Sequence, residues 1–101
     1  MGILSSFFGG SEDSRLLKAL ELAKSGRPEK AIEIYDALLA KSSSDTVKAR
    51  ALFNRALAHS ATKNDDLALK DLQTVLGMPN LPENVQTAAR SQLARVRKRA
   101  E

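Results

Sequence analysis

The chain has 101 residues, which is the size of one domain with one modest hydrophobic core. It has no cysteine and one histidine, so disulfides, a thiol nucleophile and a thiolate metal site are excluded, and little is left for a transition-metal centre. The net charge is +4, and most of the excess of basic side chains lies within residues 82–101. Strong helix formers dominate the composition, which predicts an all-α protein. The sequence has no phosphate-binding glycine loop and no paired histidine ligands, so no cofactor is expected.

Residues 1–11 are predicted to be a flexible apolar N-terminal segment. They have neither the basic start nor the long apolar run of a signal peptide, and no stretch of the chain reaches the roughly 18 apolar residues of a membrane span. We therefore expect a cytoplasmic location. An exposed apolar segment is poorly tolerated in water, so we expect its large side chains to dock on a surface. These docking residues are Ile3, Leu4, Phe7 and Phe8.

A helical domain is expected over residues 12–101, and its first part is a helical hairpin over residues 12–41. Apolar residues at helical spacing define the first helix, which Gly26 ends. Pro28 suits the first turn of the next helix, where its missing amide hydrogen is not needed.

A second hairpin is predicted over residues 45–77, after a polar linker that can cap its first helix. Asn64, Asp65 and Asp66 give the second helix of this hairpin a polar, acidic start, and Gly77 ends it. Two prolines then interrupt the helical pattern, and a capping helix with a thin apolar stripe is expected over residues 82–100.

The two hairpins repeat each other at a shift of 37 residues, which aligns Ala19 with Ala56 and Ala31 with Ala68. Together with the run from Gly26 to Tyr35, this pattern resembles the tetratricopeptide repeat (TPR) family over about residues 13–101. The sequence departs from the family at the turn of the second copy, where Lys63 replaces glycine, and its aromatic positions are mostly leucine.

The resemblance implies a right-handed solenoid of five helices that acts as a non-catalytic protein-interaction module. First helices of successive hairpins would line a concave groove, apolar at one end and basic at the other, and the partner would be a peptide segment with apolar and acidic residues. The groove residues implied are Leu16, Leu20, Lys24, Arg50, Phe53, Asn54, Leu57, Gln92, Arg95 and Arg99. Of the family's carboxylate-clamp positions only Asn54 matches, so binding of chaperone C-termini is not expected.

No catalytic residues are predicted, and we expect no enzyme. His59 is the one candidate base, and we interpret it as a partly buried packing residue because no acid or nucleophile is placed to work with it. Asp65, Asp66 and Asp71 are interpreted as helix-start carboxylates and a solvated face, not as a metal site.

Three other functions stay open from the sequence. Residues 1–8 could anchor the chain to a membrane or a larger assembly, with the helices as a spacer. The same segment could occupy the groove of its own chain, or that of a second copy in a homodimer. The basic run from Arg95 to Arg99 suggests nucleic-acid contact, but the modest net charge and the single tyrosine argue against it.

Overall fold

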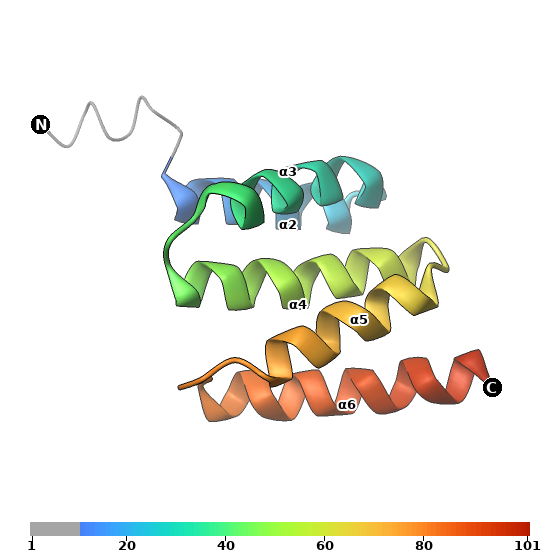
Figure 1. Cartoon of the computed structure of the whole chain (residues 1–101). Helices are drawn as coiled ribbons and strands as arrows, with labels where there is room; N and C mark the ends of the chain where they lie inside the picture. The colour runs from blue at the N-terminus through green and yellow to red at the C-terminus, as the bar shows by residue number, and fades with distance from the viewer. Residues whose placement is uncertain (1–10) are drawn as a thin grey trace, which may run out of the picture.

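A computed structural model describes residues 11–101, and this part of the chain is all-α, with five helices and no strand. Figure 1 shows them in chain order from blue to red. The helices are α2 (Glu12–Lys24), α3 (Pro28–Lys41), α4 (Asp45–Ala61), α5 (Asp65–Leu76) and α6 (Glu83–Ala100). The prediction of an all-α chain with five helices is confirmed for the described residues.

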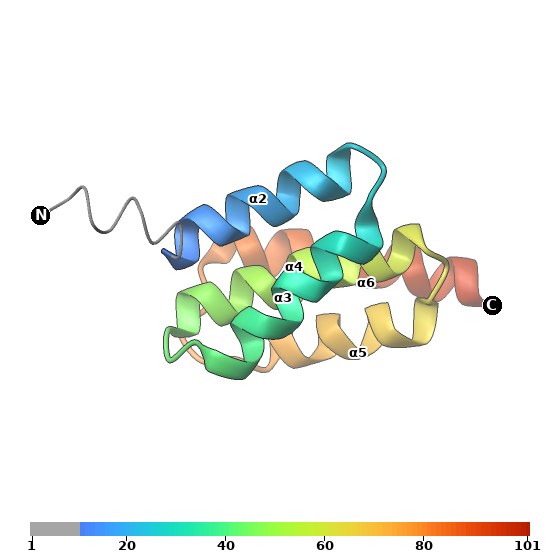
Figure 2. The same ribbon diagram turned by 90° about the horizontal axis from the view of Figure 1, so that it is seen from above.

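Helices that follow each other in the chain pack against each other, and α2 also contacts α4. Figure 1 shows the result as a stack, with α2 and α3 at one side, α4 in the middle, and α5 and α6 at the other side. The view from above in Figure 2 separates α2 from α3, which overlap in Figure 1. The start of α2 and the C-terminus lie at opposite ends of the stack in both views.

The helix ends follow local side-chain chemistry. The Ser11 hydroxyl accepts a hydrogen bond from the Ser14 amide at 3.1 Å, and the Ser44 hydroxyl accepts one from the Val47 amide at 3.2 Å. Each bond satisfies an amide that the first turn leaves without a helical partner. Pro28 is the first residue of α3, as its fixed backbone angle favours.

Two hydrophobic cores stabilise the stack, and α4 belongs to both. The first core joins α2, α3 and α4, with Tyr35 and Leu38 fully buried at its centre. The second core joins α4, α5 and α6, with Leu72, Val75 and Val96 fully buried. Alanines at the helix crossings allow this close approach, and six are buried completely across the two cores. One of them is Ala51 of α4, and each of the other five lies on one of the five described helices. These five are Ala19, Ala31, Ala56, Ala68 and Ala89.

In the part of the chain that the structure describes, no helix combines the length and the apolar character needed to cross a membrane. The predicted docking residues Ile3, Leu4, Phe7 and Phe8 lie outside the described residues.

Candidate functional site

A pocket of about 260 Å³ opens on the face where α2 and α4 lie side by side. Leu20 and Lys24 come from one face of α2, because they are four residues apart. Asn54, Leu57 and Ala61 come from one face of α4, because they are spaced three and four residues apart. The lining is mostly apolar, with Lys24 and Asn54 as its polar side chains near solvent.

Tyr35 of α3 also lines this pocket, between the two helices that form its walls. The tyrosine side chain is fully buried, and burial raises the pKa of its hydroxyl. Its hydroxyl oxygen has no hydrogen-bond partner among residues 11–101. A buried donor without a partner costs free energy, so this hydroxyl is an unsatisfied polar group beneath the pocket.

A second hollow, of about 450 Å³, lies at the other end of the same two helices. Asp13 of α2 and Arg50 of α4 contribute to it, together with Val47. The two helices therefore run in the same direction, and a hollow lies at each end of the surface between them. Leu17 belongs to the groove face of α2 between the hollows, and it is 60% exposed, which is unusual for leucine in these helices. We call this surface the α2/α4 groove.

The structure brings some of the predicted groove residues together and separates others. Leu20, Lys24, Asn54 and Leu57 line one pocket, and Arg50 lies at the opposite end of the groove. Leu16 is buried in the first core, so it supports the groove from beneath instead of facing a ligand. On α2, the face that packs in the core and the face toward the groove are adjacent, because Leu16 is buried and the next residue, Leu17, is exposed.

Phe53 is half-buried, packs against the second core and lines neither hollow of the α2/α4 groove. The three residues predicted from the capping helix, Gln92, Arg95 and Arg99, lie on α6, which packs on α5. They do not line either hollow of the α2/α4 groove.

Arg99 has contacts within its own chain. Its guanidinium donates hydrogen bonds of 2.6 Å to Asp65 and 2.6 Å to the Ser60 hydroxyl. These contacts tie the end of α6 to the turn between α4 and α5, where a more polar depression is found. Arg99 was predicted as a ligand-binding cation. In the structure its ion pair with Asp65 joins α6 to α5, and its hydrogen bond to Ser60 joins α6 to α4.

A partly buried polar cluster lies between α3, α4 and α5, and sequence reasoning missed it. The Arg55 guanidinium donates two hydrogen bonds to Asp71, at 2.9 and 2.8 Å, and a third to Asp36 at 2.8 Å. Asp71 is only 4% exposed, so the prediction that it belongs to a solvated face is wrong. Its carboxylate is stable in the interior because the paired guanidinium neutralises it, and the hydrogen bond to Asp71 raises the pKa of Arg55.

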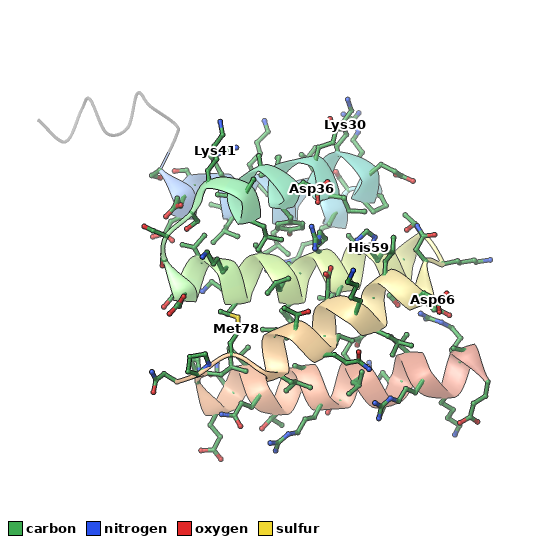
Figure 3. All side chains as sticks on the ribbon, viewed as in Figure 1. Lys30, Asp36, Lys41, His59, Asp66 and Met78 are labelled. Atoms are coloured by element: carbon green, nitrogen blue, oxygen red, sulfur yellow. The ribbon has the colours of Figure 1, made fainter. Side chains whose placement is uncertain are left out.

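His59 lies beside this cluster, and Figure 3 shows it on α4 with Asp36 nearby on α3. Its Nε2 atom is 3.8 Å from an Asp71 oxygen, so an acid does lie close to it, contrary to the sequence analysis. Its buried Nδ1 atom has no hydrogen-bond partner among the described residues. Burial lowers the pKa of His59 below 6.5, and Arg55 lowers it further, while Asp71 opposes both.

A signal for the buried aspartate is present in the sequence. Asp71 is three residues after Ala68 and four before Val75, which places it on the buried face of α5 by helical periodicity. The sequence analysis assigned Asp71 to a solvated face because it is acidic, although its helical position predicts burial. The residue that makes burial tolerable, Arg55, is 16 residues away, and a local pattern does not connect the two.

Neither His59 nor Asp71 lines a hollow of the α2/α4 groove, so the cluster contributes to packing between helices and leaves the groove lining to other side chains.

Comparisons with protein-family models, with curated proteins and with solved structures gave no match.

Proposed function

We propose that this chain is a TPR-like protein-interaction module without catalytic activity, built as a right-handed solenoid of two helical hairpins and a capping helix. Its α2/α4 groove would bind an extended peptide segment of a partner protein. The observation that supports this proposal is the apolar pocket between Leu20 and Leu57, which opens on the face where α2 and α4 meet. Such a pocket provides the buried centre that binding interfaces need.

The chemistry of the pocket suggests the kind of residue that enters it. Small-molecule sites usually measure about 300–1,000 Å³, and this pocket of about 260 Å³ is slightly smaller. It therefore suits one or two aliphatic side chains of a longer segment. Lys24 and Asn54 at its edge favour an acidic or amide-accepting neighbour next to that anchor.

Selection from a phage-displayed library of random 12-residue peptides tests the proposal. Peptides enriched on the immobilised full chain are synthesised with a fluorescent label, and their affinities are measured by polarisation. We expect an aliphatic anchor flanked by acidic residues. The Ala61→Arg variant places a bulky cation at the pocket wall and should weaken binding about tenfold or more, since a lost pocket contact of about 1.4 kcal/mol has this effect.

Ala40→Arg is the matched control, because Ala40 is also exposed and also lies in the last turn of its helix. Both variants add the same charge, so a general charge effect would change both affinities alike. Peptides that bind both variants equally well would contradict the proposed site. A selection without any enriched peptide would contradict the proposed function itself.

A further inference from the structure

We propose that the N-terminal segment of the same chain folds back and occupies the α2/α4 groove, with Ile3 and Leu4 in the apolar pocket. The inference rests on the proposed function, because it names the first occupant of the proposed peptide site. It makes the chain a module that a partner must open by competition. The groove, the reach of the segment and the chemistry of the segment each support it.

The groove begins where the segment is attached. Ser11 precedes α2 and itself lines the hollow at this end of the groove, together with Val47 and Arg50. A chain that turns back at this point meets the groove at once. Gly9 and Gly10 directly precede Ser11, and glycine adopts the backbone angles of a tight reversal without steric cost.

The length of the segment matches the length of the groove. At about 1.5 Å per helical residue, Leu20 lies about 13 Å and Lys24 about 20 Å along α2 from Ser11. Leu4 is seven residues before Ser11, so an extended chain carries it up to about 24 Å, enough to reach the pocket after the reversal. Phe8 is three residues before Ser11 and reaches only about 10 Å, to the level of the exposed Leu17.

The chemistry of the segment matches each part of the groove. Residues 1–10 have no charged side chain, and their large apolar side chains are separated by polar serines. Burial of Ile3 and Leu4 in the pocket, and of Phe8 against Leu17, would remove apolar surface of both partners from water.

A nitroxide spin label tests this arrangement on the full chain. The chain has no cysteine, so Ser5→Cys gives a single labelling site next to Leu4. We expect the label to broaden the amide signals of Lys24 and Ala61, at the far end of the groove. A second labelled sample carries Ile3→Ser and Leu4→Ser, which remove the anchors. Broadening in this sample should be confined to the residues next to Ser11.

Two further outcomes would overturn the inference. Broadening confined to the start of α2 and α4 in both samples would show that the pocket is not occupied. Broadening in a mixture of ¹⁵N-labelled chain with unlabelled chain that bears the nitroxide, together with a doubled mass by light scattering, would show that a second copy fills the groove instead.

Affinity for a selected peptide separates this inference from the proposed function. If the segment occupies the groove about nine-tenths of the time, its removal by Ile3→Ser with Leu4→Ser should strengthen peptide binding about tenfold. Unchanged binding that is still sensitive to Ala61→Arg would overturn the self-docking and leave the peptide site intact. Loss of sensitivity to Ala61→Arg would contradict the proposed function.

Discussion

The partly buried cluster of Arg55, Asp71 and His59 shows how single residues depend on neighbours from other helices. Asp71 has a guanidinium partner with two hydrogen bonds, and it is therefore satisfied as an anion. His59 has no such hydrogen bond, and burial favours its neutral form. A proton added at Nδ1 would find no acceptor among the described residues, and the nearby Arg55 would repel the new charge.

This difference predicts a loss of stability in mild acid. Because the pKa of His59 is lowered in the folded chain, the unfolded chain takes up the proton first, at about its ordinary value of 6.5. The stabilising contribution is complete above this pH, is lost as the pH falls through it, and levels off below the folded pKa. Urea unfolding at pH 7.5 and pH 5.5 measures the effect.

His59→Gln provides the comparison, since glutamine does not titrate. The free energy of unfolding of the wild-type chain should fall more between the two pH values than that of the variant. Carboxylates that begin to titrate at the lower pH are shared by both proteins and cancel in the difference. Parallel pH dependences would contradict the lowered pKa.

At the scale of helices and turns, the two hairpins repeat each other in backbone as well as in sequence. Gly26 has a φ of 84° and Lys63, which is 37 residues later, has a φ of 64°. Both turns therefore use the left-handed conformation at the same place. A residue with a side chain is strained in this conformation. Lysine in place of glycine therefore lowers the stability of the second hairpin, but the turn keeps the same backbone conformation.

Lys63→Gly should therefore stabilise the chain. Removal of the strained Cβ gains about 1 kcal/mol, and the larger entropy of glycine in the unfolded chain offsets part of it. Thermal and urea unfolding measure the change. Lys70→Gly is the matched control, because Lys70 is exposed within α5 and should lose about 0.5–1 kcal/mol. A loss of stability in both variants would show that the turn at Lys63 carries no strain.

The sequence predicted the elements better than it predicted the site. Helix ends depend on local features, such as the capping serine before α4 and Pro28 at the start of α3, and these can be recognised along the chain. The groove depends on which side of a helix a neighbour covers. Leu16 and Leu17 are adjacent in sequence, yet one is buried and the other is largely exposed because of how α2 meets α3 and α4.

At the scale of the whole molecule, α4 is the helix on which the fold depends. Val47 and Ala51 face the first core, and Leu52 and Ala56 face the second, so α4 connects two cores that share little else. The outer helices α2 and α6 each contact one core. In a stack of this kind, the end units can open while the middle remains folded.

Hydrogen exchange should show this order directly. We expect the slowest backbone amides in α4 near Ala51 and Leu52, because both cores must open before these amides exchange, and faster exchange in α2 and α6. Val96→Ala weakens only the second core, by about 1–2 kcal/mol, and should speed exchange in α5 and α6 while α2 and α3 keep their protection. Leu38→Ala removes a side chain of the first core that is equally buried, and should have the opposite distribution. If both variants speed exchange uniformly over all five described helices, the two cores unfold as one unit, and the role assigned to α4 as the link between separable cores is contradicted.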